Sequence, residues 1–153
     1  MISGKKYRIV FFVLASLLLT ISCGKEKTLT MDMDETETVD PKLNKGIGPI
    51  KEVKLDAMNS ALAERGKKVF ESKCAACHKF EIRVVGPALQ GVTQRRSPEW
   101  IMNLILNTNE MVEKDPIVKG MIAIYMTKMT LQDVKEEEAR GILEYFRQKD
   151  STP

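Results

Sequence analysis

Cysteine and histidine are scarce in this sequence of 153 residues, which holds three cysteines and one histidine. Three cysteines are too few for a disulfide scaffold, and with a single histidine they leave too few well-placed ligands for a structural zinc site. No apolar run is long enough to span a bilayer comfortably, since the longest, residues 9–19, is followed by Thr20. The positions of the few cysteines and the histidine are therefore more informative than their number.

An excess of charge of one sign is also missing. The chain has 24 Lys plus Arg against 21 Asp plus Glu, but Lys5, Lys6 and Arg8 lie in a segment that we expect to be removed. Removing those three leaves 21 against 21. A neutral mature chain gives no support for nucleic-acid binding.

The N-terminus has the pattern of an export signal. Basic residues from Lys5 to Arg8 precede the apolar run 9–19, and Ser22 and Cys23 follow. The last part resembles a bacterial lipoprotein processing site, although Thr20 stands where that family usually has leucine. The resemblance implies that Cys23 becomes a lipidated first residue, held to a membrane of the bacterial cell envelope and facing the periplasm. An uncleaved anchor and a soluble exported protein remain as alternatives.

A polar and acidic stretch follows Cys23 and continues to about residue 55. Residues 28–41 read TLTMDMDETETVDP and have no helical or alternating apolar period. Such a composition buries too little surface to offset the backbone entropy lost on ordering. We therefore expect a signal peptide over 1–22, a flexible tether over 23–55 and a folded domain over 56–150.

A C-x-x-C-H motif occupies residues 74–78, where Cys74 and Cys77 flank two alanines and His78 follows. This is the attachment sequence for c-type haem, because two thiols at this spacing reach the vinyl groups on one edge of a porphyrin and the histidine ligates the iron. A thioredoxin-like dithiol also uses a C-x-x-C pair, but the surrounding sequence lacks the alternation of strands and helices that its fold requires. The motif predicts one covalent haem c.

Residues on both sides of the motif resemble the class I cytochrome c family over roughly 56–149. Gly66 and Phe70 precede the motif as in that family's first helix, where a glycine lets the C-terminal helix approach closely. Ile142 and Tyr145 look like the partners that the last helix presents to them. The resemblance implies an all-α fold of about four to five helices around the haem.

The loop after the motif carries a second part of the resemblance. Gly86, Pro87 and Leu89 match the family's G-P-x-L loop, which implies that they contact the haem. By the same resemblance, the Pro87 carbonyl accepts a hydrogen bond from His78 Nδ1, which fixes the ring and raises its basicity.

Helix signals dominate the domain, and no convincing pair of strands is present. Asp56 or Ser60 is the expected N-cap of a first helix that continues to about Lys73. The last helix is expected to begin near Lys135, because the three glutamates 136–138 favour the N-terminal end of its dipole.

Two proline-marked starts predict further helices. Ser97–Pro98 and Asp115–Pro116 each place an N-cap residue before a proline at the first helical position, and the second helix is expected to end near Tyr125. Trp100 lies in the first of these helices. An aromatic residue at a comparable place in relatives donates to a haem propionate, so Trp100 is a candidate for that role or for packing alone.

The side of the iron opposite His78 requires a ligand, and a methionine there would raise the reduction potential. In the family this methionine lies in an extended loop at a fixed distance before the last helix. Measured back from Tyr145, Met129 fits that distance, although Thr130 replaces the usual proline. Met126 is the alternative ligand, and Met121 is expected to fill the core.

The function expected from these features is single-electron transfer by a protein that is not an enzyme. A haem peroxidase would need a second ionisable group beside the iron, and the only histidine is already used. The first alternative is a haem-based gas sensor or ligand-binding protein with a displaceable sixth ligand. The second is a lipoprotein dithiol oxidoreductase that uses Cys74 and Cys77 without haem.

The expected partners are redox proteins of a respiratory chain. Residues 97–129 are loosely similar to small cytochromes that accompany copper-containing nitrous oxide reductases, and a terminal oxidase is the competing acceptor. Four lysines surround the attachment site and suit an acidic partner, or form an ordinary solvated face: Lys67, Lys68, Lys73 and Lys79.

Overall fold

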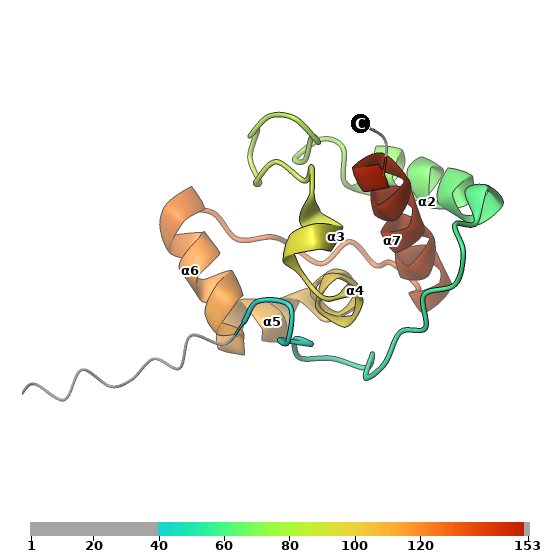
Figure 1. Ribbon diagram of the computed structural model, residues 1–153. Helices are drawn as coiled ribbons and strands as arrows, with labels where there is room; N and C mark the ends of the chain where they lie inside the picture. The colour runs from blue at the N-terminus through green and yellow to red at the C-terminus, as the bar shows by residue number, and fades with distance from the viewer. Residues whose placement is uncertain (1–39, 152–153) are drawn as a thin grey trace, which may run out of the picture. The chain divides into compact units, whose positions relative to one another are not determined.

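Residues 40–151 are described by the computed structural model of the protein, and their regular secondary structure is entirely helical. The helices are α2 (Ser60–Lys73), α3 (Val92–Arg95), α4 (Pro98–Leu106), α5 (Thr108–Lys114), α6 (Pro116–Tyr125) and α7 (Glu136–Ser151). The expected all-α class is confirmed, and the short α3 and α5 exceed the four to five helices expected. In Figure 1, α2 and α7 lie together on one side, α6 lies on the other, and α3 and α4 lie between them.

The N-cap of α2 differs from both expected residues. Asn59 caps the helix, and its Oδ1 accepts a hydrogen bond from Leu62 N at 3.0 Å. The predictions of Asp56 and Ser60 are therefore wrong. Asparagine caps as well as aspartate or serine, and a tertiary contact selects position 59, because Asn59 N also donates to Glu144 Oε1 at 2.9 Å.

The two proline-marked helix starts are confirmed. Ser97 Oγ accepts from Trp100 N at 3.1 Å to begin α4, and Asp115 Oδ1 accepts from Val118 N at 2.9 Å to begin α6. Helix α6 ends at Tyr125 as predicted, because Met126 adopts a left-handed backbone conformation with φ of 54°.

Helices α2 and α7 cross at two glycines. A Cβ atom on Gly66 would overlap the Gly141 carbonyl, and a Cβ atom on Gly141 would lie 3.2 Å from Gly66 Cα. The pair therefore lets the two backbones touch. Gly66 was expected at this crossing from the family resemblance, whereas Gly141 was not predicted.

Four aromatic rings join the loop after the C-x-x-C-H motif to these helices. Phe70 of α2, Phe80 of the loop, and Tyr145 and Phe146 of α7 lie with ring centroids 5.4 to 6.4 Å apart. Several pairs meet edge to face, an arrangement that aromatic quadrupoles favour. This aromatic cluster fixes the loop against the longest two helices.

Residues 44–53, which we call the strap, are packed on α4 and α5. Asn103 Oδ1 of α4 accepts from Ile50 N at 2.9 Å, and its Nδ2 donates to two strap carbonyls, each at 2.9 Å. Glu99 Oε1 accepts from Val53 N at 3.0 Å. The flexible tether predicted up to residue 55 is therefore wrong over the strap, and the folded unit begins before residue 56. The strap has no apolar period because buried polar side chains of α4 order its backbone.

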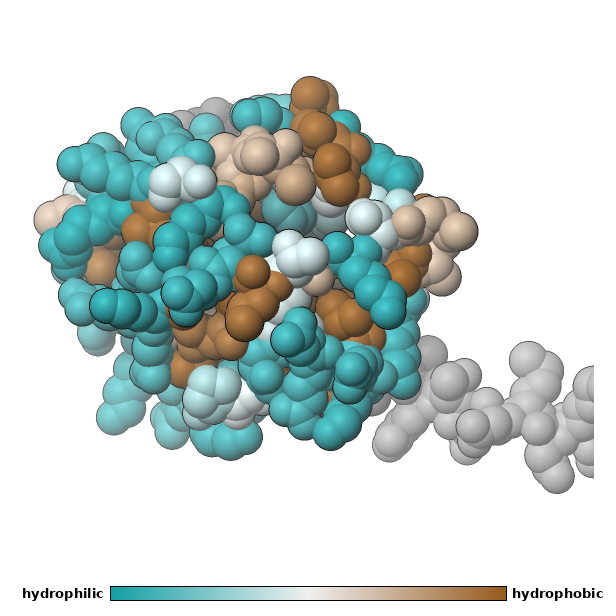
Figure 2. Space-filling model, turned by 180° about the vertical axis from the view of Figure 1, so that it is seen from behind, coloured by the Kyte–Doolittle hydropathy of each residue, from teal (hydrophilic) through white to brown (hydrophobic). Residues whose placement is uncertain are grey.

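Hydrophilic side chains cover most of the face drawn in Figure 2, and hydrophobic ones gather there in separate areas. Over residues 40–151, no helix is long and apolar enough to cross a bilayer. The predicted signal peptide over 1–22, the predicted lipidation of Cys23 and the tether up to residue 39 lie outside the described residues.

Candidate functional site

Cys74, Cys77 and His78 lie in a tight turn that ends α2. Cys74 is the C-cap, and its N–H donates to the Phe70 carbonyl at 2.8 Å. The N–H groups of Cys77 and His78 both donate to the Cys74 carbonyl, at 3.1 and 3.0 Å. The turn places both thiols and the imidazole on the wall of one cavity.

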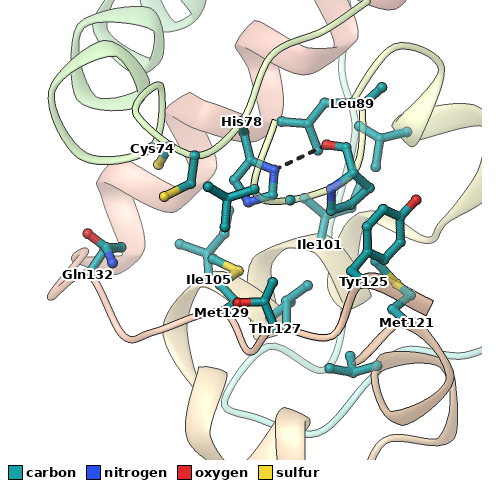
Figure 3. Close-up of a pocket in the computed structure, with 18 of the residues that line it drawn as sticks. Cys74, His78, Leu89, Ile101, Ile105, Met121, Tyr125, Thr127, Met129 and Gln132 are labelled. Carbon is teal, nitrogen blue, oxygen red and sulfur yellow. Dashed lines mark hydrogen bonds between the residues drawn. The ribbon is translucent and has the colours of Figure 1, made fainter. Parts of the chain in front are cut away.

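The imidazole of His78 is held by the loop that follows it. Its Nδ1 lies 3.3 Å from the Pro87 carbonyl oxygen, as the resemblance implies, and Figure 3 draws this contact as a dashed line. A carbonyl only accepts, so Nδ1 carries the proton and Nε2 keeps the lone pair that binds a metal. Burial lowers the pKa of His78, and the hydrogen bond to Pro87 partly opposes this effect. The ring is therefore neutral and available as a ligand at neutral pH.

Gly86 allows the loop to lie against the ring. A Cβ atom at this position would overlap the His78 side chain. The loop is held in place by hydrogen bonds from Gly86 N to the Cys77 carbonyl and from Leu89 N to the Lys79 carbonyl, both at 3.0 Å. Gly86, Pro87 and Leu89 all line the cavity, as the resemblance implies.

The environment of Cys74 differs from that of a reactive dithiol's nucleophile. Cys74 is half-buried and Cys77 is exposed, and neither forms a disulfide. Burial raises the pKa of Cys74, Lys73 opposes the rise and Cys77 adds to it. Dithiol oxidoreductases depend on a cysteine whose pKa is lowered, so this environment counts against the dithiol alternative.

The cavity measures about 680 Å³ and lies between the C-x-x-C-H turn, α4, α6 and α7. This volume is within the range of cofactor pockets. Its walls are mainly apolar, and α4 contributes much of them through four side chains, which are Trp100, Ile101, Leu104 and Ile105. Such walls exclude water from whatever the cavity holds.

The three candidate methionines differ in position. Met129 is partly buried and lines the cavity, and in Figure 3 it lies on the segment between α6 and α7. Met126, the alternative ligand, is 85% exposed because the left-handed turn after α6 directs it away. Met121 also lines the cavity, but it lies within α6 and packs against the core, as expected. The geometry therefore favours Met129 among the three.

Trp100 has a different polar partner from the one the resemblance implied. The side chain is buried and lines the cavity, but its Nε1 donates to Asp115 Oδ2 at 3.3 Å. The indole N–H is thereby engaged inside the protein, which favours packing over the propionate role as the task of Trp100.

Two arginines that the sequence analysis missed, Arg95 and Arg96, line the cavity where α3 ends. The Arg96 guanidinium carbon lies 5.2 Å from the ring of Trp100. Burial and the charge of Arg95 lower the pKa of Arg96, and Asp115 opposes the shift, yet a guanidinium keeps its charge at neutral pH. The available signal was two adjacent arginines directly before the Ser97–Pro98 helix start.

These features together fit a flat, largely apolar group with acidic substituents. Two thiols and an imidazole lie on one wall, and glycine at position 86 makes room for the imidazole ring of His78. Guanidinium groups at another part of the wall suit carboxylates. A porphyrin with an iron centre and two propionates has this set of requirements.

The family model described as "Cytochrome c" matches residues 63–150, which is more than half of the chain. The chain belongs to the cytochrome c family. This cytochrome is of class I, and its family membership implies one covalently bound haem c with its iron.

Solved and curated relatives agree with this assignment. A cytochrome c from Rhodothermus marinus is 44% identical, with a TM-score of 0.68 over 69% of this chain and 92% of that one. A "Cytochrome c-553-like" protein of Synechocystis is 39% identical over 46 residues, and "Cytochrome c-551" of Stutzerimonas stutzeri is 48% identical over 42. These matched segments are 29% and 27% of this chain, and they span only 44% and 40% of the two curated relatives.

Proposed function

We propose that this cytochrome c is a single-electron carrier, not an enzyme, with His78 and Met129 as the axial ligands of its iron. The observation that carries the proposal is that both side chains enter the same apolar cavity from two different loops (Figure 3). When bound, the haem supplies a one-electron couple. The residues of the chain hold this group, exclude water from it and tune its potential.

Each part of the site has a distinct task in this proposal. Cys74 and Cys77 provide the two thioether attachments, and the Pro87 carbonyl orients His78. A methionine thioether opposite the imidazole stabilises the reduced iron and raises the potential. Arg95 and Arg96 supply positive charge on the wall of the cavity, where it suits the propionates.

We propose that the protein is exported and lipid-anchored through Cys23 in the bacterial cell envelope, facing the periplasm. The support is the sequence pattern before Cys23. The proposed electron acceptor is a cell-envelope terminal reductase, such as a copper-containing nitrous oxide reductase, or a terminal oxidase.

An acidic partner surface would meet the lysines near the attachment site, but Lys73 has a different task. Its Nζ donates to the Asp133 carbonyl at 2.7 Å and lies 3.7 Å from Glu138 Oε2, so it links α2 to the start of α7. Lys68 and Lys79 are exposed and remain available to a partner. The docking proposal therefore rests on these two lysines.

The ligand assignment is tested by absorption spectra of Met129→Ala and Met126→Ala. We expect the weak near-infrared band of methionine-bound ferric haem in the wild type and in Met126→Ala, because Met126 is exposed. Met129→Ala should lose the band, show a lower midpoint potential and bind carbon monoxide when reduced.

Two other results would change the proposal. Loss of the band in Met126→Ala alone would make Met126 the ligand. A wild-type protein that lacks the band and binds carbon monoxide at neutral pH would favour a gas sensor or ligand-binding protein.

A further inference from the structure

Asp115 is a buried carboxylate that joins three parts of the fold. It is 1% exposed, and its Oδ2 accepts from Asn44 Nδ2 at 2.8 Å and from Trp100 Nε1 at 3.3 Å. Its Oδ1 caps α6 by accepting from Val118 N at 2.9 Å. The carboxylate therefore connects the strap, the cavity wall on α4 and the first turn of α6.

Asn44, the first residue of the strap, is held so that its amide donor faces Asp115. Its Oδ1 accepts from Gly46 N at 2.7 Å, which fixes the orientation of the side-chain amide. Its carbonyl accepts from Ser97 Oγ at 2.6 Å, which fixes its backbone beside the start of α4. The Nδ2 group is thereby set in place to donate to the carboxylate.

Helix α6 packs on α5 and, through Ile117, Met121 and Ile122, against the core. Val118 is its one fully buried residue. At its far end, the Arg83 guanidinium lies 4.5 Å from the Tyr125 ring centroid. Figure 1 shows α6 at the side of the molecule, with the segment that follows it crossing back toward α7. The segment that carries Met129 is thus fixed at its start by α6 and at its end by the hydrogen bond from Lys73 to the Asp133 carbonyl.

We propose that Asn44 is a positioning residue for the sixth-ligand side of the cavity, because its hydrogen bond to Asp115 fixes α6 and thereby the placement of Met129. The inference rests on the proposed function, which makes Met129 the ligand. Asn44 lies outside the region 63–150 matched by the family model. The strap therefore adds a determinant of ligand placement from outside that region.

The decisive variant in the full haem-loaded chain is Asn44→Asp. It keeps an oxygen acceptor for Gly46 N but replaces the amide donor by a carboxylate that faces Asp115 and repels it. We expect a weaker near-infrared band in the oxidised protein and about tenfold faster carbon monoxide binding to the reduced protein. Asn44→Ala, which removes the donor without adding charge, should show the same changes to a smaller extent.

The matched control is Glu99→Ala. Glu99 also holds the strap, but its side chain bonds to Val53 N and Lys45, which lie away from Asp115, and it does not line the cavity. We expect this variant to lower the unfolding midpoint while leaving the band and the carbon monoxide rate at wild-type values. If Glu99→Ala changed the near-infrared band and the carbon monoxide rate as much as the Asn44 variants do, the inference would be overturned. General destabilisation of the strap would then explain the changes.

The remaining outcomes separate the two proposals. If the wild type shows the near-infrared band and both Asn44 variants keep the wild-type spectrum and carbon monoxide rate, the inference is overturned. The proposed ligation by Met129 then still stands. Should Asn44→Asp fail to accumulate as a haem protein, Asn44→Ala decides by the same two readouts. Absence of the band from the wild type overturns the proposed ligation, and the inference with it, before any substitution is compared.

Discussion

His78 and Trp100 are both fixed in the cavity wall by hydrogen bonds to other parts of the chain. His78 is held by a backbone carbonyl nine positions away, and Trp100 is held by the carboxylate of Asp115. Each ring is thus fixed through one nitrogen, which leaves Nε2 of His78 for the iron and the apolar face of Trp100 for packing in the cavity wall. Fixed rings around a cofactor reduce the rearrangement needed when its charge changes.

At the residue scale, Arg96 is predicted to raise the reduction potential. Its charge lies on the cavity wall, where positive charge disfavours the oxidised form of the iron. We expect Arg96→Gln to lower the midpoint potential by up to about 60 mV, which is tenfold in equilibrium for a one-electron couple. A redox titration followed by absorbance measures this shift.

Lys114→Gln provides the comparison for Arg96. Lys114 also carries a positive charge, but it pairs with Glu110 at 2.8 Å on the exposed face of α5. Its removal should leave the potential nearly unchanged, because solvent screens it. Equal shifts in the two variants would show that net charge, and not the position of Arg96, sets the effect.

The attachment residues were predictable, and some of their neighbours were not. Cys74, Cys77 and His78 form a contiguous motif whose spacing follows from the chemistry of the bond. The partner of Trp100 was missed because Asp115 reaches it through tertiary packing, and its sequence signal was already explained by the helix cap. Asp115 both caps α6 and accepts from Trp100, and only the cap has a local sequence pattern.

At the element scale, local signals predicted α4 and α6 and missed shorter elements. Helix α3 has four residues and α5 has seven, so neither offers the apolar period of a longer helix. The strap was missed for a related reason, since its backbone is ordered by Asn103 and Glu99 of α4. A segment whose backbone is held by side chains far away in the sequence shows no hydrophobic period of its own.

The crossing of α2 and α7 gives a prediction at this scale. Gly66→Ala should destabilise the protein by about 1–3 kcal/mol or more, because its Cβ would overlap backbone that cannot yield without moving a helix. Gly141→Ala should destabilise it less, since its nearest contact is 3.2 Å away. Urea unfolding of the haem-loaded proteins, followed by helical circular dichroism, measures both.

Gly120→Ala is the control for these substitutions. Gly120 lies in α6, and nothing lies within 4 Å of a Cβ built there. Alanine should stabilise the protein by about 0.4–1 kcal/mol through lower backbone entropy of the unfolded chain. If Gly66→Ala behaved like Gly120→Ala, the close approach of the two helices would be wrong.

At the scale of the whole molecule, Glu144 connects the beginning of the folded helices to their end. Its side chain is fully buried and accepts from Arg140 at 2.6 Å, Arg147 at 2.8 Å and Asn59 N at 2.9 Å. Arg147 also donates to the Asp56 carbonyl at 2.9 Å. One carboxylate of α7 thus holds the N-terminal end of α2 and the chain that leads into it.

This network predicts how stability depends on pH. Burial acts to raise the pKa of Glu144, but hydrogen bonds from Arg140, Asn59 and Arg147 outweigh it and place the pKa below the ordinary value of 4.5. A carboxyl whose pKa is lower in the folded state stabilises the protein above that ordinary value and loses this effect as the pH falls below it. Stability should therefore decline below about pH 4.5.

Glu144→Gln isolates this contribution. At pH 7 the variant should be less stable by about 1.5–3 kcal/mol, because the hydrogen bonds from two arginines lose their charged acceptor. The difference from the wild type should narrow as the pH is lowered toward 3. Thermal unfolding across this range measures it, and parallel curves would show that Glu144 does not cause the dependence.

The aromatic cluster and α6 support different walls of the cavity. Four rings from α2, α7 and the loop after the motif support the wall that carries His78, whereas Ile117, Met121 and Ile122 of α6 pack against the core elsewhere. The two walls are therefore held by separate sets of contacts, so a substitution behind one wall should leave the side chains of the other in place.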